Sequence, residues 1–145
     1  MQKTQTGPRL FTLAEAQKML PLVRSIVSDI VERYSRFKMR VEESRLAQAA
    51  RGDASTPVEI RARDRMKREI EELKDRVMEV VGELSELGAD LREYEEGMVD
   101  FPARLGEEIV YLSWKLGEPR IAHWRPLDGT DSPRRSLEEL HERSI

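Results

Sequence analysis

The chain has 145 residues, of which 37% are charged and 39% hydrophobic, and its 25 basic and 28 acidic side chains leave a net charge of −3. This balance gives no general attraction to nucleic acid or to an anionic membrane surface, so we expect neither as a partner. The absence of cysteine excludes disulfides, thiolate metal sites and cysteine nucleophiles, and it favours the cytoplasm. Residues 1–9 do not resemble a signal peptide, and no apolar run approaches the roughly 18 residues of a membrane span.

A first helix is expected over residues 12–50. Thr12 and Glu15 have the spacing of a capping box, in which each side chain accepts a hydrogen bond from the backbone N–H of the other residue. Pro21 predicts a kink or a short break, because proline removes a helical hydrogen bond and clashes with the preceding turn. Beyond it the apolar residues recur at intervals of four and three: Val23, Val27, Ile30, Tyr34, Phe37 and Val41.

A second helix is expected over residues 56–88. Thr56 and Glu59 form another capping box, Pro57 occupies the first helical position, and Gly88 suits a C-terminal cap. An unbroken heptad seam runs along this helix: Met66, Ile70, Leu73, Val77, Val80, Leu84, Leu87 and Leu91. Because the loop at residues 51–55 is short, the first helix is the antiparallel partner of this seam.

Residues 89–127 are expected to form a β-rich module. Residues 89–94 are either a last helical turn or a short strand, and residues 108–114 are a strand. Residues 120–125 are the return strand of a hairpin whose turn lies at residues 116–119. Residues 127–135 read as loop, and residues 136–140 as a short, frayed helix within a tail over residues 128–145. The predicted fold is a single mainly α (α+β) domain, a long, coiled-coil-like antiparallel helical hairpin followed by a small antiparallel β module.

The helices also predict self-association. Two helices alone make a thin core, and four flanking apolar residues widen the stripe beyond a two-helix seam: Ile26, Val31, Met78 and Val81. We therefore expect a dimer or a tetramer that assembles through the helices, most simply as a four-helix bundle in the dimer.

The β module holds the candidate site. Asp100, Glu118 and His123, with Asp128, are the residues that would bind a divalent metal if the module folds back on itself; otherwise the acids are turn formers and His123 a hairpin residue. The chain has two histidines, His123 and His141, and neither of the two expected helices carries an H-x-x-x-H or E-x-x-H pair. Several arginines flank the two tryptophans and could hold a phosphate or carboxylate, although nearby acids dilute the positive field: Arg104, Arg120, Arg125, Arg134 and Arg135.

Three motifs carry a family resemblance. They are F-T-L-A-E-A at residues 11–16, G-M-V-D-F-P at 97–102 and E-I-V-Y-L-S-W-K-L-G-E-P at 108–119, followed by Trp124. Together they resemble an uncharacterised prokaryotic family, the domain of unknown function 2203. Ser113 stands where the family has cysteine and Arg125 where it has histidine, so a metal held through those two positions is not expected here in the same way. The resemblance implies no activity, but it draws attention to these candidate ligand-binding residues: Asp100, Arg104, Tyr111, Trp114, Glu118, His123 and Trp124.

Two functional hypotheses follow. The first is a non-catalytic, bacterial, cytoplasmic scaffold whose hairpins assemble and whose β module presents a surface to a protein partner. The second is a small-molecule or metal-binding protein, with or without enzymatic activity, whose site lies in the β module. No nucleophile elbow, P-loop or dinucleotide fingerprint supports a specific catalytic class.

Overall fold

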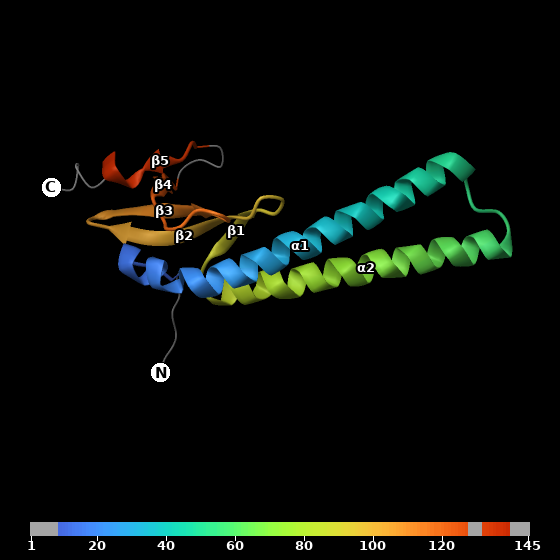
Figure 1. Cartoon of the computed structure of the whole chain (residues 1–145), viewed down its shortest axis with the longest axis horizontal. Helices are drawn as coiled ribbons and strands as arrows, with labels where there is room; N and C mark the ends of the chain where they lie inside the picture. The colour runs from blue at the N-terminus through green and yellow to red at the C-terminus, as the bar shows by residue number, and fades with distance from the viewer. Residues whose placement is uncertain (1–8, 128–131, 140–145) are drawn as a thin grey trace.

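The computed structural model describes residues 9–127 and 132–139. The described elements are the helices α1 (Leu13–Arg51) and α2 (Pro57–Glu86) and the strands β1 (Asp90–Glu93), β2 (Met98–Leu105), β3 (Glu108–Lys115), β4 (His123–Arg125) and β5 (Arg135–Ser136). The two helices pack antiparallel, and the sheet lies beside the start of α1 and the end of α2 (Figure 1). The expected α+β fold, a long helical hairpin followed by an antiparallel sheet, is confirmed. No helix of the described residues is long and apolar enough to cross a membrane.

Helix α1 begins at its capping box. The Thr12 N–H donates to the Glu15 carboxylate at 2.9 Å, and the Glu15 N–H donates to the Thr12 hydroxyl at 3.1 Å. The helix then continues through Pro21 as one element. Figure 1 shows its first, blue turns at an angle to the remainder, a bend of the kind that follows when a proline removes a hydrogen bond.

Helix α2 also has well-defined ends. Thr56 and Glu59 form the second capping box, with both hydrogen bonds at 3.1 Å and a proline at the first helical position. The regular helix ends at Glu86, and the Gly88 N–H donates to the Ser85 carbonyl at 2.9 Å. Gly88 has a φ of 98°, a conformation that favours glycine just after a helix, so the chain turns there into the sheet.

The five strands form one antiparallel sheet in the order β1-β2-β3-β4-β5. Residues 89–94, which the sequence left open between a helical turn and a strand, contain the strand β1. The return strand of the hairpin, β4, is shorter than the expected residues 120–125. Residues 135–136, expected as loop and helix start, instead pair with β4 as β5. Residues 137–139 are helical, and the rest of the expected tail, at 128–131 and 140–145, lies outside the described residues.

One face of the sheet is apolar and packs against the first half of α1. Side chains directly opposite on adjacent strands share a face, and one such row joins Phe101, Leu112 and Trp124. Neighbouring rows of the same face add further buried residues: Val99, Ala103, Val110 and Trp114. They form one core cluster with buried residues of both helices: Ala16, Leu20, Val23, Val27, Ile30, Val80 and Leu84.

Two connections fix α1 to the sheet. The Gln17 side-chain amide donates to the Ile121 carbonyl at 3.0 Å and accepts from the Ile121 N–H at 3.0 Å. The Phe11 N–H donates to the Pro102 carbonyl at 2.8 Å, and the Arg104 N–H donates to the Phe11 carbonyl at 3.1 Å. Both connections lie before the second half of α1, which the sheet reaches only through its β1–β2 turn, where Glu95 pairs with Lys38.

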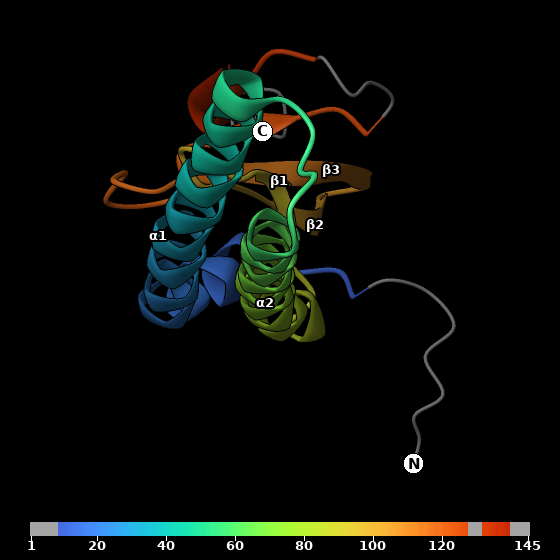
Figure 2. The same ribbon diagram turned by 90° about the vertical axis from the view of Figure 1, so that its right-hand side faces the viewer.

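Beyond the sheet the hairpin continues as a two-helix arm, which we define as residues 31–76. No side chain in the arm is fully buried: the last buried residue of α1 is Ile30, and the first of α2 is Val77. The two helices separate toward their loop, and end-on they appear as two rods in front of the sheet (Figures 1 and 2). The sheet touches the arm through its β1–β2 turn, where the Tyr94 ring lies 5.1 Å from that of Tyr34.

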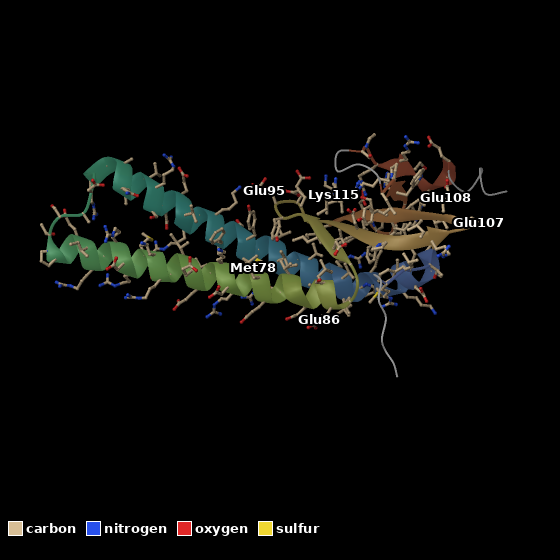
Figure 3. The ribbon with its side chains drawn as sticks, turned by 180° about the vertical axis from the view of Figure 1, so that it is seen from behind. Met78, Glu86, Glu95, Glu107, Glu108 and Lys115 are labelled. Carbon is tan, nitrogen blue, oxygen red and sulfur yellow. The ribbon has the colours of Figure 1, made fainter. Side chains whose placement is uncertain are left out.

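The four flanking residues that suggested self-association behave differently from one another. Ile26, Val31 and Val81 pack against the core of their own chain, so they give no support to an interface. The prediction was wrong for these three because the sheet and the bend of the chain cover positions that an isolated hairpin would expose. Met78 alone remains half exposed, at 50%, on the face of α2 seen in Figure 3.

Candidate functional site

A row of polar side chains crosses the face of the sheet that is turned away from α1. The strand register pairs Asp90 with Asp100, Asp100 with Ser113, Ser113 with His123, and His123 with Ser136. Five consecutive strands therefore each place a polar residue in one line. Two of the sequence candidates, Asp100 and His123, lie in this row.

Asp100 forms a buried ion pair with Arg125. Asp100 is 3% exposed and Arg125 is 2% exposed. Arg125 donates from Nη2 to one carboxylate oxygen, and its Nε lies 3.4 Å from the other. The guanidinium also lies 4.8 Å from the ring centre of Tyr111, its cross-strand partner, and Arg92 approaches the carboxylate at 3.7 Å. The charge of Asp100 is thus balanced by arginines of its own chain.

The same carboxylate affects its neighbour in the row. Burial and, second, the negative charge of Asp100 raise the pKa of Asp90 above its usual value. Two acidic residues directly opposite each other on adjacent strands repel, so this pair costs stability at neutral pH.

Arg134 holds a second cluster together. Its Nε donates to the Ser113 hydroxyl at 2.9 Å and its Nη2 to the Ser113 carbonyl at 3.1 Å. The same guanidinium makes two hydrogen bonds, of 2.9 and 2.7 Å, to the Glu118 carboxylate. Burial alone would raise the pKa of Glu118, but the bonds from Arg134 and from the Lys115 N–H outweigh it, and the pKa is lowered.

His123 and Trp124 each contain a buried nitrogen without a hydrogen-bond partner in the described part of the chain: Nδ1 of His123 and Nε1 of Trp124. His123 Nδ1 lies 3.9 Å from a Glu118 oxygen, beyond hydrogen-bonding distance. Because consecutive residues of a strand point to opposite faces, these two nitrogens do not converge on one point.

Two further candidates have structural roles. Trp114 is fully buried in the apolar face, and its indole N–H donates to the Glu118 carbonyl at 2.9 Å. Arg104 is exposed near the end of β2, and its N–H contributes to the pairing with Phe11. The sequence candidates are therefore divided between the two faces of the sheet: Asp100, Tyr111 and His123 lie on the polar face, with Glu118 reaching it from the β3–β4 turn.

Both acidic metal candidates are paired with arginines. Asp100 is paired with Arg125, and Glu118 with Arg134. Among the described residues, no group of three or more histidine, cysteine or acidic side chains is placed to hold a metal ion. Asp128 and His141 lie outside the described residues.

The two departures from the family motifs occupy these same clusters. Ser113 accepts a hydrogen bond from Arg134, and Arg125 binds Asp100. Sequence reasoning placed Arg134 only in a loose group of arginines. No local pattern marks its role, because its partners lie 16 and 21 residues earlier and meet it only through the pairing of β5 with β4.

A surface groove of about 450 Å³ lies between the two helices of the arm. It is lined mainly by charged residues of both helices: Arg33, Arg36, Arg40, Glu69, Glu72, Leu73 and Arg76. Arg40 bridges the helices by donating to Glu69, and it also donates to Glu43 at 2.8 Å. Because both side chains of this cross-helix ion pair are partly exposed, it adds little to the stability of the arm.

These features define an α+β protein in which a helical arm projects from a small sheet with one polar face. The chain belongs to the uncharacterised conserved protein family DUF2203, whose model matches residues 9–137. The family resemblance inferred from the sequence motifs is therefore confirmed. No curated protein and no solved structure matches the chain.

Proposed function

We propose that this protein is a non-catalytic, cytoplasmic scaffold that self-associates through its helical arm. The observation that carries the proposal is the absence of any fully buried side chain over residues 31–76, although the apolar seam continues through them. Helices in proteins gain most of their stability from packing an apolar face against other elements. Apart from the β1–β2 turn, which contacts the arm at Tyr34 and Lys38, no third element of the described chain covers this face.

Exposed apolar side chains support the same proposal. Among the residues that the structure describes, nine large hydrophobic ones are substantially exposed, and seven of them belong to the two helices: Leu22, Met39, Val41, Leu46, Val58, Ile60 and Met78. Single exposed apolar residues are common on protein surfaces. Here, however, five of the seven lie within the arm, where no side chain is fully buried.

Native mass spectrometry of the intact chain, purified without added metals or chelators, tests the proposal. We expect a species of twice the chain mass of 16.8 kDa. Ile60→Ser should shift the population toward the monomer, because Ile60 is an apolar residue of the arm that is 36% exposed. Ile109→Ser is the matched control, since Ile109 is 40% exposed but lies on the sheet. A monomer throughout the micromolar range would refute the proposal.

A small-molecule site on the polar face of the sheet is the second candidate. The unpartnered Nδ1 of His123 beside the Glu118 carboxylate favours it, because buried polar atoms usually have a hydrogen-bond partner. The same mass spectrum tests this candidate. A bound small molecule, seen as a stoichiometric extra mass that Glu118→Gln abolishes and the exposed control Glu107→Gln retains, would support this candidate. The mass of the polypeptide alone in every preparation would count against it.

A further inference from the structure

We infer that two copies associate antiparallel along α2, through a second heptad-spaced stripe on the surface of that helix. This inference rests on the proposed self-association and specifies its geometry. The stripe consists of residues spaced by four and three: Ile60, Asp64, Lys67, Glu71, Lys74 and Met78. Such spacing places all six on one side of a helix over about 27 Å.

The stripe is not the side of α2 that packs against α1. Lys67, Glu71, Lys74 and Met78 each follow a seam residue by one position, which places the stripe about 100° round the helix from the seam. Ile60 is 36% exposed, Met78 is 50% exposed, and the three charged residues near the centre are exposed as well. Within the described chain Lys67, Glu71 and Lys74 form no ion pair: their charges have no partner of their own.

The order of residues in the stripe is self-complementary when a second copy runs the other way. With Lys67 opposite the partner's Glu71, the same register places Asp64 opposite the partner's Lys74 and Ile60 opposite the partner's Met78. Two-fold symmetry repeats each contact, so two apolar pairs flank four pairs of opposite charge. A parallel arrangement would instead place each residue beside its own copy, with lysine against lysine and acid against acid.

The charge distribution over the whole of α2 favours the same orientation. Residues 57–68 contain five basic and two acidic side chains, whereas residues 69–86 contain two basic and seven acidic ones. This arrangement opposes the helix dipole, which favours acids at the N-terminal end and bases at the C-terminal end. The segregation therefore does not serve the isolated helix. An antiparallel partner would align each half with the oppositely charged half of the other copy.

Charge reversal tests the register. K67E and E71K should each raise the dissociation constant of the dimer about tenfold or more, because each converts two attractive contacts into repulsive ones. The double variant K67E/E71K should restore the wild-type value. Both residue types form helices well, so circular dichroism should show unchanged helix content.

Mixing the two single variants separates the interface from effects within one chain. Residues 67 and 71 are also neighbours on one helix, and each single variant creates a like-charge pair there. In a mixed dimer every contact between positions 67 and 71 of different chains joins a glutamate to a lysine. We therefore expect K67E and E71K to form a heterodimer more tightly than either forms a homodimer, by sedimentation velocity. A dimer unaffected by either charge reversal would overturn this geometry and leave the proposed self-association standing; a monomeric wild type would overturn both.

Disulfide trapping gives an independent test, because the chain contains no cysteine. Under mild oxidation, a mixture of I60C and M78C should form a cross-linked heterodimer, whereas M78C alone should remain uncross-linked. V58C mixed with M78C is the control, since Val58 is 67% exposed but lies outside the stripe. Preferential cross-linking of M78C to itself would contradict the antiparallel arrangement.

Discussion

Gly97 shows how closely the sheet approaches α1. It has a φ of 82°, and a Cβ placed there would lie 2.7 Å from Val27 Cγ1 and 3.0 Å from Val31 Cγ2. We expect Gly97→Ala to lower the free energy of unfolding by about 1–3 kcal/mol, because it combines backbone strain with overpacking. Chemical denaturation measures the change.

The matched control is Gly82→Ala. Gly82 lies within α2, and an added Cβ there would meet no atom within 4 Å. Alanine has the higher helix propensity, so this variant should be more stable than the wild type by about 0.5–1 kcal/mol. Equal losses of stability in both variants would show that the close approach of Val27 and Val31 to Gly97 does not cause the loss.

Two acids of the sheet should affect stability in opposite directions. The raised pKa of Asp90 means that its stabilising contribution is complete below its ordinary value of 3.8 and is lost as the pH rises through the folded-state pKa. The lowered pKa of Glu118 means that its contribution is present above its ordinary value of 4.5 and is lost as the pH falls through the folded-state pKa.

At pH 7, therefore, Asp90→Asn should stabilise the protein and Glu118→Gln should destabilise it. Both differences from the wild type should shrink as the pH is lowered toward 3, where the wild-type acids become protonated. Denaturation midpoints at pH 7 and at the lowest pH at which the fold persists provide the measurement. The same sign of change for both variants at pH 7 would contradict these pKa shifts.

At the scale of elements, Arg134 connects the last strand to the rest of the sheet. Its four hydrogen bonds reach Ser113 and Glu118, while β5 itself has only two residues. Arg134→Ala should release this segment locally and leave the core intact. Hydrogen exchange at the Leu137 N–H, which donates to the Ala122 carbonyl, should accelerate about tenfold or more.

Arg135→Ala serves as the comparison for that experiment. The Arg135 guanidinium lies 5.5 Å from the centre of the buried Trp124 ring, and Arg135 itself is exposed, so this single contact contributes less than the four hydrogen bonds of Arg134. Its loss should change the same exchange rate by much less. If the two variants behave alike, the hydrogen bonds of Arg134 do not hold β5.

Local signals in the sequence predicted where helices and strands begin and end better than they predicted which residues contact one another. The capping boxes at Thr12 and Thr56 involve residues three positions apart, and both form as expected. In contrast, β5 exists only because Arg135 and Ser136 pair with β4, which no local pattern encodes. The arginine partners of Asp100 and Glu118 also come from distant positions, so the sequence identified the acids but could not reveal what neutralises them.

The heptad seam shows a different limit of the sequence. Its periodicity identified the side of α2 that packs against α1, and Val77, Val80 and Leu84 are buried as expected. The same periodicity continues through Met66 and Ile70, which are only half buried because the helices separate. A repeat specifies a face of a helix but not how completely that face is covered.

For the whole molecule, self-association should make thermal stability depend on protein concentration. A partner that binds only the folded chain stabilises it by mass action, and for a homodimer a tenfold increase in concentration corresponds to about 1.4 kcal/mol per dimer, or about 0.7 kcal/mol per chain. For a chain of this size we expect the Tm to rise by about 2 °C per tenfold step. Differential scanning calorimetry at 10-fold steps in concentration, about 10 to 1000 μM, measures it; a constant Tm would indicate a monomer.

Sedimentation equilibrium of the wild-type chain measures self-association of the arm. Self-association predicts a molar mass that approaches twice 16.8 kDa as the concentration rises through the micromolar range, and that falls when added salt screens the charged stripe. A molar mass of 16.8 kDa at every concentration and ionic strength would contradict it.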